Sequence, residues 1–382
     1  MKHIITGANG FLGSHLVAAL LERGETVVAL ARGNASERMR AALKQLNCPD
    51  KARNLYPLSG DITTGALGSL RNMLKRVDTF WHIAADTRFT AQHAEEIIRV
   101  NLDGTRHALW LADKMNVTTF IYISTAYVCG DYKGIFPELP HPSLGQTPRN
   151  AYEKSKLEAE ELVTKWAKQT GRNYLILRPG IIAGDSVTGM TNLYNGYYGF
   201  MKGWWQLKHQ ILTRRDSYHF SKEIVDVPIA IPGHTEALLS ITTIDYVLRL
   251  MLDIASLRHI ENRTYHLVSS DPKTFGWWLH NGLRILGIEG VSIDPDCKPE
   301  RGTALGLVQR QLISLSRPYI PYVSGEPRFA MENLLSLPID TSHPTLDVAL
   351  LERLLQYAIE HEFGEAANSG LQEYQEAVPL LW

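Results

Sequence analysis

The feature that most constrains the fold is a glycine-rich turn close to the start of the chain. It runs Thr6-Gly7-Ala8-Asn9-Gly10-Phe11-Leu12-Gly13 and follows a short apolar strand pattern at 3–5. Leu12, Leu16 and Leu20 then recur at a helical spacing. A G-x-x-G-x-x-G turn between strand and helix lets backbone approach a pyrophosphate and directs helix N–H groups at it. The turn therefore predicts a dinucleotide site.

The three glycines serve different purposes in such a turn. Gly7 makes the tight turn, Gly10 removes a side chain from the phosphate path, and Gly13 lets the helix pack on the strand. Glycine-rich turns also occur in many ordinary loops, so the motif alone is weak. The prediction depends on the strand before it, the helix after it, and a Tyr-x-x-x-Lys at Tyr152 and Lys156.

Apolar runs alternate with helical patterns through the first 180 residues. The predicted strands are 2–5, 26–31, 55–58, 79–83, 119–123 and 174–177, and the predicted helices include 13–23, 95–115, 151–170 and, later in the chain, 240–256. This alternation implies βαβ units with right-handed crossovers. We therefore predict an α/β fold of the Rossmann type, with a doubly wound parallel sheet.

Composition indicates a globular protein with no strong overall electrostatic field. Its 382 residues carry a formal net charge of −1, which does not favour nucleic acid or an anionic membrane. The three cysteines, Cys48, Cys129 and Cys297, form no metal-binding pattern, so no metal is expected. No apolar run approaches the roughly 18 residues of a spanning helix, and no signal peptide is visible. A cytoplasmic protein without a transmembrane segment is expected.

The end of the second predicted strand indicates which dinucleotide is bound. An NAD site usually offers an acidic side chain here for the ribose 2′-hydroxyl, whereas arginine suits a 2′-phosphate. This chain has Ala31 and Arg32, with Arg38 as a second candidate contact. A solvated loop arginine is the alternative. The missing acid favours NADP, used as NADPH.

Other strand ends carry weaker signals. Asp61, before Ile62, is placed to accept from an adenine amino group, and Ala84 and Ala85 leave room for a cofactor. Asn101 is either a buried polar brace near the active site or an ordinary helix-interior asparagine. His82, at the end of the fourth strand, is given no role because buried histidines are commonly structural.

Tyr152 and Lys156 stand at i and i+4 and share a helix face. An ammonium beside a phenol favours the phenolate, so we expect a lowered pKa for Tyr152 and a role in proton transfer. Ser124 and Thr125 end a strand and offer hydroxyls to a substrate oxygen. An exposed pair formed by chance is the alternative, and the order of the motifs argues against it.

These motifs, in this order, resemble the extended short-chain dehydrogenase/reductase family. The resemblance implies the catalytic residues Thr125, Tyr152 and Lys156, where Thr125 takes the hydroxyl position five before Gly130 and Lys156 holds the nicotinamide ribose. It also implies this set of cofactor-binding residues: Thr6, Gly7, Asn9, Gly10, Phe11, Leu12, Gly13, Arg32, Asp61, Ile62, Ala84, Ala85, Asn101, Ser124, Tyr152, Lys156, Pro179, Ile181 and Ile182.

A narrower resemblance lies in the segments 123–128, 178–189, 244–247 and 263–268. They look like the branch of fatty acyl-CoA reductases and thioester reductase domains. That branch implies NADPH-dependent reduction of an acyl thioester, bound to CoA or a carrier protein, to an aldehyde, which a second hydride transfer would take to an alcohol. The alternatives are a ketone/alcohol oxidoreductase, a nucleotide-sugar epimerase or dehydratase, and a non-catalytic NADP-binding regulator. Nothing in the sequence indicates an oligomeric state.

The family also implies a smaller, discontinuous substrate-binding lobe in the C-terminal half. We assign residues 1–189 to the NADP-binding domain, with a return at about 237–270, and 190–236 and 271–382 to the substrate-binding region. Aromatic residues in 194–205 precede basic ones in 208–222, including Arg214 and Arg215. We favour an acyl site with the thiol carrier nearby, and a helix that packs its aromatics onto the Rossmann domain and solvates its charges is the alternative.

Overall fold

The computed structural model describes residues 1–46, 48, 52–64, 77–214, 223–257, 262–299, 302–317, 319–325 and 327–365. The chain forms two compact units. The larger unit comprises Met1–Ile182, Ala237–Pro272 and Pro321–Pro344, and the smaller unit comprises Ala183–Glu236, Lys273–Ile320 and the chain from Thr345 onward. Both units are therefore discontinuous in sequence.

The larger unit is built on a seven-stranded parallel sheet. Its strands lie in the order β13 (Arg263–Leu267), β7 (Asn173–Pro179), β5 (Thr119–Ile123), β4 (Thr79–His82), β1 (Lys2–Thr6), β2 (Thr26–Ala31) and β3 (Leu55–Ser59). From β1 the chain adds β2 and β3 on one side, and it then crosses back to add β4, β5, β7 and β13 on the other side of β1. The strand order therefore reverses between β1 and β4. This arrangement confirms the predicted Rossmann-type α/β fold.

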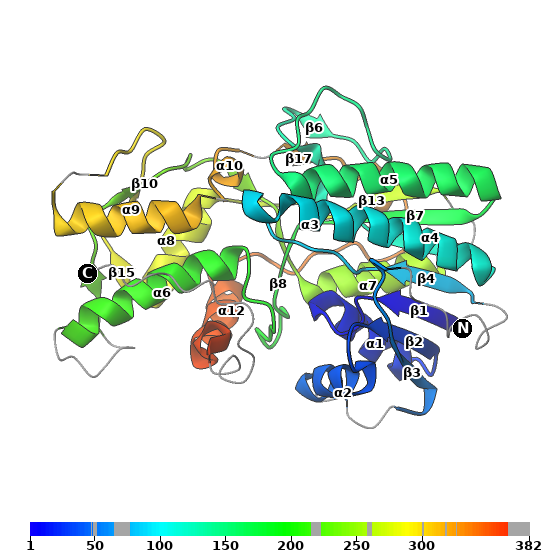
Figure 1. Ribbon diagram of the computed structural model, residues 1–382. Helices are drawn as coiled ribbons and strands as arrows, with labels where there is room; N and C mark the ends of the chain where they lie inside the picture. Colours follow the sequence, from blue (N-terminus) through cyan, green and yellow to red (C-terminus); the bar gives the residue numbers. More distant parts are fainter. Residues whose placement is uncertain are drawn as a thin grey trace. The chain divides into compact units, whose positions relative to one another are not determined.

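Helices cover both faces of the sheet (Figure 1). One layer consists of α1 (Phe11–Glu22), α2 (Ala35–Gln45) and α7 (Ile244–Ser256), and the other of α3 (Ala94–Ile98), α4 (Gly104–Lys114) and α5 (Ala151–Thr170). Along β5, Ile121 and Ile123 pack in the core with α1 and α7, while Phe120 and Tyr122 pack with α4 and α5. Both faces of β5 are thus buried, as is usual inside a parallel sheet.

Two predicted helices differ from the observed elements. The helix predicted at 95–115 is interrupted by a π-helical turn, Arg99–Asp103, between α3 and α4. The helix predicted from 240 begins at Ile244, because β12 (Ile241–Thr243) pairs instead with β8 (Ile181–Ala183). A run of β-branched residues favours this strand.

The segment Pro321–Pro344 completes the larger unit. Its strand β17 (Arg328–Phe329) pairs in parallel with β6 (Ile135–Phe136). Met331 and Leu334, of which Leu334 lies in α11 (Glu332–Leu335), are buried in the core beside α1 and α7. The predicted domain boundaries had placed this segment in the substrate-binding region, and they had placed 183–189 in the first domain.

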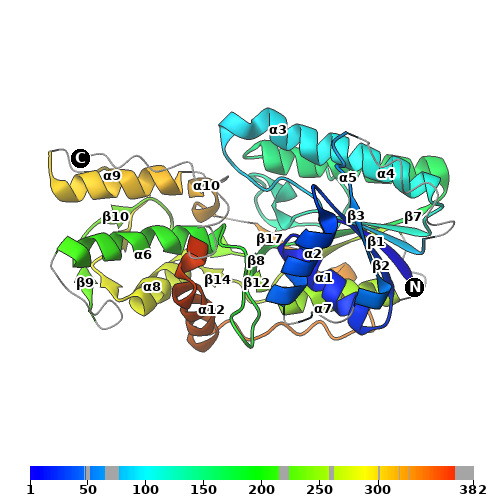
Figure 2. The same ribbon diagram turned by 60° about the horizontal axis from the view of Figure 1, so that its bottom comes forward.

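The smaller unit is mainly helical. In it, α8 (Phe275–Leu286) contacts both α6 (Tyr197–Arg214) and α12 (Val348–Glu360), and α6 also contacts α9 (Ala304–Ser316) (Figure 2). Two short parallel strand pairs, β9 (Val225–Asp226) with β15 (Ile288–Glu289) and β10 (Ala230–Ile231) with β16 (Ser292–Ile293), lie beside these helices.

Candidate active site

The predicted site residues follow the carboxyl ends of the strands. The glycine-rich turn follows β1, Arg32 follows β2, Asp61 lies beyond β3, and Ala84 lies beyond β4. Thr125 follows β5, and Ile181 follows β7. In a parallel sheet all these ends lie along one edge, and ligands bind there, where the strand order reverses. The fold thus collects residues from across 180 positions of sequence.

The glycine-rich turn has the geometry of a phosphate cradle. A Cβ atom on Gly7, whose φ is +68°, would lie 2.8 Å from the backbone of Ala84, and one on Gly13 would lie 2.1 Å from Gly7 O. Gly10 is the N-cap of α1 and gives it no side-chain cap hydrogen bond. The amides of the first turn of α1 are therefore suited to an anion rather than to a side chain.

A hydrogen-bonded chain holds this turn against β4. The Thr6 hydroxyl contacts His82 Nδ1 at 2.8 Å and accepts from the amides of Ile83 and Ala84 at 3.2 Å. His82 Nε2 lies 3.0 Å from Thr105 Oγ1, which donates to Asn101 O. Burial lowers the pKa of His82 to about 3, and the Lys156 charge acts in the same direction, so the ring is neutral. His82 is structural, and Thr6 shapes the turn.

The proposed adenosine side of the site is charged. Arg32 is exposed, and Arg38 lies beside it, with guanidinium atoms 3.6 Å from the position of a Cβ on Gly33. Burial would raise the pKa of Asp61, but hydrogen bonds from Thr63 and the charge of Arg32 lower it below its usual value. Ile62 is buried against Gly104. Asp61 is thus an ionised acceptor close to Arg32.

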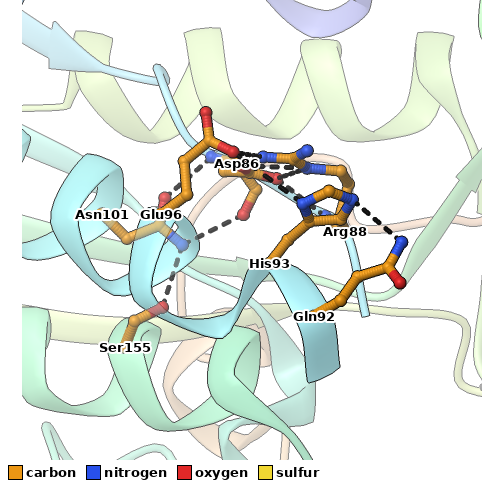
Figure 3. A network of polar contacts seen from close by, with 7 residues as sticks. All are labelled: Asp86, Arg88, Gln92, His93, Glu96, Asn101 and Ser155. Carbon is orange, nitrogen blue, oxygen red and sulfur yellow. Dashed lines mark hydrogen bonds and ion pairs between the residues drawn. The ribbon is translucent and has the colours of Figure 1, made fainter. Parts of the chain in front are cut away.

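Of the two roles that the sequence allowed for Asn101, the structure shows the buried polar brace. From the π-helical turn, its Oδ1 accepts from the Asp86 amide at 2.7 Å (Figure 3). Its Nδ2 donates to Asp86 O at 3.0 Å and to Ser155 Oγ at 2.9 Å, and Ser155 Oγ donates to Tyr152 O at 2.8 Å. Asn101 therefore fixes the segment after Ala85 to the first turn of α5.

The three predicted catalytic residues come together in the larger unit. Thr125 and Tyr152 share a side-chain hydrogen bond, and Thr125 Oγ1 also accepts from the Tyr127 amide at 3.2 Å. Lys156 Nζ donates to Ile123 O at 2.5 Å and lies 4.4 Å from the centroid of the Tyr122 ring. Thr125 and Lys156 are only 4% and 3% exposed. Two hydroxyls and an ammonium thus meet at the end of β5.

The expected lowering of the Tyr152 pKa is wrong for this structure. Burial raises the pKa of Tyr152 to about 12, and the hydrogen bond with Thr125 only partly opposes this. Burial also lowers the pKa of Lys156 to about 7, against the attraction of Glu160. Spacing along a helix shows that two side chains share a face, but it does not show how far that face is shielded from solvent. Tyr152 therefore holds its proton at neutral pH.

A buried ion pair that the sequence analysis missed supports the same strand end. Ser124 Oγ donates to Glu160 Oε1 at 2.6 Å, so this hydroxyl is directed to the protein. Arg178 Nη2 and Glu160 Oε2 lie 2.6 Å apart, and both side chains are fully buried. Glu160 stands four residues after Lys156, one further turn of the same helix, and that spacing was a usable signal.

The segment after β7 lies close to the sheet edge. Pro179 ends β7, and Ile181 and Ile182 begin β8. The Ile181 amide donates to Ser240 O at 2.8 Å, and both isoleucine side chains are partly buried. A Cβ on Gly180 would lie 2.2 Å from Ser240 O, so this turn is tightly packed.

Phe89, which had no sequence signal, packs on the ring of Tyr152 and links it to two further rings. Phe89 lies 5.6 Å from Tyr152 and 5.4 Å from Tyr322, measured between ring centroids. Tyr322 also contacts Tyr127 at 5.1 Å. Tyr322 follows Tyr152 by 170 residues of the chain, so no local pattern could have predicted their proximity.

The aromatic run of α6 has a different place from the one expected. Tyr197, Tyr198, Trp204 and Trp205 are buried within the smaller unit, and Tyr197 Oη donates to Trp278 O at 2.9 Å. They form part of that unit's own core, whereas the alternative interpretation packed them onto the Rossmann domain. Residues 215–222, with Arg215, and the tail 378–382 lie outside the described residues, as does the side chain of Arg214.

No helix in the described part of the chain is long and apolar enough to cross a bilayer. Over the same residues, no group of three or more histidine, cysteine or acidic side chains is arranged to hold a metal ion.

Sequence comparison gives a family match and distant relatives. The NAD-binding family described as male sterility protein matches residues 5–251. A quinoline-1-oxide ketoreductase from Stigmatella aurantiaca is 30% identical over 189 residues, which cover 49% of this chain and 52% of the relative. Fatty acyl-CoA reductase 1 from Xenopus laevis is 26% identical over 51% of this chain and 46% of its own length. The chain thus spans about half the length of these relatives.

Structural comparison supports the fold. The terminal R domain from the myxalamid PKS-NRPS biosynthetic pathway has a TM-score of 0.75 at 23% identity, covering 95% of this chain and 91% of that one. UDP-glucuronic acid 4-epimerase from Bacillus cereus, in complex with UDP-glucuronic acid and NAD, has a TM-score of 0.65 at 18% identity, covering 94% and 99%. At these identities the likeness is one of fold.

Proposed function

Because the chain belongs to the male sterility protein family, an NAD-binding branch of the extended short-chain dehydrogenase/reductases, we propose that it is an NADPH-dependent reductase of an acyl thioester. The observation that carries the proposal is the hydrogen-bonded pair of Thr125 and Tyr152, beside the buried Lys156 and at the same sheet edge as the glycine-rich turn. The choice of a thioester draws on the relatives, which include a fatty acyl-CoA reductase.

The described residues fit a dinucleotide. The amides after Gly10 would hold the pyrophosphate, and the tight packing of Gly7 on Ala84 leaves no room for side chains there. Arg32 and Arg38 would contact a 2′-phosphate, and Asp61 would accept from the adenine amino group. When bound, NADPH supplies the hydride for reduction.

The protein residues would manage charge on the substrate oxygen. Tyr152, which is protonated at neutral pH, and Thr125 would donate hydrogen bonds to the oxyanion as the carbonyl carbon becomes tetrahedral. Tyr152 would supply a proton as the thiohemiacetal forms and accept it again as that intermediate collapses to the aldehyde and a thiolate, which takes its proton from solvent. Lys156 would support Tyr152 electrostatically and bind the ribose.

Ketone reduction is the second candidate. The same Thr125–Tyr152 pair would protonate a ketone oxygen, and a ketoreductase is among the relatives. The two functions differ in the leaving group, because only a thioester releases a thiol.

A substrate panel tests the proposal. NADPH oxidation would be followed with acyl-CoA thioesters, acyl-pantetheine thioesters, aldehydes, ketones and a UDP-sugar, together with thiol release. We expect turnover of thioesters with one thiol released per aldehyde formed. Turnover of ketones alone would replace the thioester proposal by the second candidate.

Tyr152→Phe provides the matched control for chemistry. It removes one hydroxyl and keeps the ring, so turnover should fall by about 10²–10⁴-fold, the usual range for general acid–base catalysis. The NADPH dissociation constant should stay within roughly threefold, because little binding surface is lost. Wild-type turnover in this variant would contradict the assigned role.

A further inference from the structure

The catalytic tyrosine lies in a closed ring of contacts. Its phenol shares a hydrogen bond with Thr125, and its ring contacts Phe89 at 5.6 Å. Phe89 stacks on Tyr322 at 5.4 Å and 24°, and Tyr322 meets Tyr127 edge-on at 5.1 Å and 83°. The Tyr127 amide returns to Thr125 Oγ1. These centroid separations lie in the range of favourable aromatic pairs.

From this ring of contacts we propose that Tyr322 is a positioning residue for Tyr152, acting through the ring of Phe89. The inference rests on the proposed role of Tyr152 in catalysis. Tyr322 does not touch the reacting atoms in this assignment; it holds the aromatic wall that covers the phenol.

Tyr322 is itself held firmly. Its hydroxyl accepts from Asn150 Nδ2 at 2.7 Å, and the nearby charge of the Glu153 carboxylate raises the pKa of Tyr322 in addition to burial. The Arg149 guanidinium carbon lies 4.7 Å from the centroid of its ring. With 5% of its surface exposed, Tyr322 is more constrained than the half-buried Phe89. Phe89 is therefore the adjustable member of the pair, and Tyr322 is its support.

The contacts of Tyr322 also reach the helix that carries the catalytic residues. Asn150 is the N-cap of α5, and its Oδ1 accepts from the Glu153 amide at 2.9 Å. Tyr152 is the second residue of that helix. Tyr322 thus contacts both Phe89, whose ring packs on Tyr152, and Asn150, which caps the helix that carries Tyr152.

A segment far along the chain supplies this support. Tyr322 belongs to Pro321–Pro344, which enters the larger unit directly after Ile320 of the smaller unit. The same segment is fixed downstream by β17 and by Asn333, whose amide donates to the buried Glu138 at 2.6 Å. Its docking on β6 and on Glu138, which both belong to the first 180 residues, therefore places Tyr322 beside Phe89.

Two substitutions test the inference independently. Tyr322→Leu removes the supporting ring, and Phe89→Leu removes the ring between Tyr322 and Tyr152 without deleting a buried residue. Both should lower kcat by about 10- to 100-fold, the scale of a small misplacement of a catalytic group. KM and the NADPH dissociation constant should change by less than about threefold. The assay would use whichever substrate of the panel the wild type turns over.

Two further variants separate positioning from general damage. Tyr322→Phe keeps all three ring contacts and should recover most of the kcat that Tyr322→Leu loses. Tyr246→Phe deletes the hydroxyl of another buried tyrosine, whose Oη donates to Val268 O at 3.1 Å, and should have wild-type kcat. Wild-type kcat in both leucine variants, or a rise in KM at constant kcat, would overturn the inference.

A readout without turnover distinguishes this failure from failure of the proposed function. In the protein labelled at the tyrosine Cζ carbon, the Tyr152 resonance is identified by its loss in Tyr152→Phe. It should shift in Tyr322→Leu and Phe89→Leu and remain in place in Tyr246→Phe. An unmoved Tyr152 resonance in folded leucine variants would refute the positioning role, whereas absent thioester turnover would refute only the substrate assignment.

Discussion

Lys156 has an environment that links its charge to pH near neutrality. Burial lowers its pKa to about 7, so the ammonium is present below this pH and lost above it. If the charge supports Tyr152 and binds the ribose, kcat/KM should fall as pH rises through about 7. His82, with a pKa of about 3, and Tyr152, with a pKa of about 12, do not titrate in this range.

Lys156→Arg tests this dependence, because a guanidinium stays charged throughout. The larger side chain should reduce the absolute rate, but the decline near pH 7 should disappear from the pH–rate profile. Glu138→Gln is the control, since burial also raises the pKa of Glu138 to about 7. That variant should keep the decline. A decline that persists in Lys156→Arg would remove Lys156 as its source.

Arg32 sets the expected preference between the two coenzymes. Arg32→Asp replaces a cation at the end of β2 by an acceptor for a ribose 2′-hydroxyl. Losing a charge-assisted hydrogen bond of about 1.5–3 kcal/mol should shift the ratio of the NADPH and NADH dissociation constants toward NADH by roughly 10- to 100-fold. Titration of both coenzymes measures this. An unchanged ratio would make Arg32 a surface residue, and Arg38→Ala would then be the next variant.

At this scale the sequence predicted which residues meet but not their environment. Thr125, Tyr152 and Lys156 were identified because their motifs have recognisable spacings. The direction of the Tyr152 pKa depends on the residues that exclude water from it, and Phe89 and Tyr322 belong to no motif. Asn101 was left between two roles for the same reason: its partners Asp86 and Ser155 lie on other segments.

Among the elements, β5, α5 and β7 are joined by the Glu160–Arg178 ion pair. Arg178→Met would leave a fully buried carboxylate without its partner, which typically costs about 3–5 kcal/mol of unfolding free energy. Urea unfolding should show this loss. The double variant Glu160→Met/Arg178→Met should lose less unfolding free energy than the two single variants together, because neither buried charge is then left without its partner.

The same helix provides a surface pair for comparison. Lys165 and Glu161 on α5 are 63% and 45% exposed and lie 2.6 Å apart. Lys165→Met should change the unfolding free energy by no more than about 1 kcal/mol, since solvent screens such pairs. Equal losses in Lys165→Met and Arg178→Met would show that burial does not govern these interactions.

The regular elements were predictable where periodicity was strong. Strand Thr26–Ala31 and helix Ala151–Thr170 occupy the predicted residues, because a continuous apolar run defines the strand and clear caps define the helix. The π-helical turn at Arg99–Asp103 was not predictable, since a helical pattern continues through it and the interruption serves the tertiary contacts of Asn101.

For the whole molecule, the return of Pro321–Pro344 to the larger unit has a measurable consequence. The amides of Arg328, Ala330 and Asn333 donate to Gly134 O, Phe136 O and Glu138 Oε2. Hydrogen exchange of peptides covering 328–335 should therefore be as slow as that of β13 and much slower than that of the exposed loop 142–146. Exchange as fast as in that loop would contradict the docking described.

Glu138→Ala is the matched variant for this measurement. It removes the acceptor of the His266 and Asn333 amides and should speed exchange in 328–335 while β1 stays protected. Sequence analysis assigned this segment to the substrate-binding region because it follows 190–320 in the chain. Its short apolar pieces, such as 328–331, carry no periodic signal, and only long-range pairing reveals their place.

The catalytic residues and the aromatic residues that pack around Tyr152 come from different parts of the fold, and this has a consequence for how the enzyme can evolve. Thr125 and Lys156 are buried in the framework that holds the sheet together, so changes there endanger folding and activity at once. Phe89 lies in the segment after β4, and Tyr322 lies in the short helix α10 (Ile320–Val323). Libraries of variants confined to 86–93 and 319–325 should therefore yield altered substrate specificity while coenzyme binding persists, because the reactive centre is left unchanged.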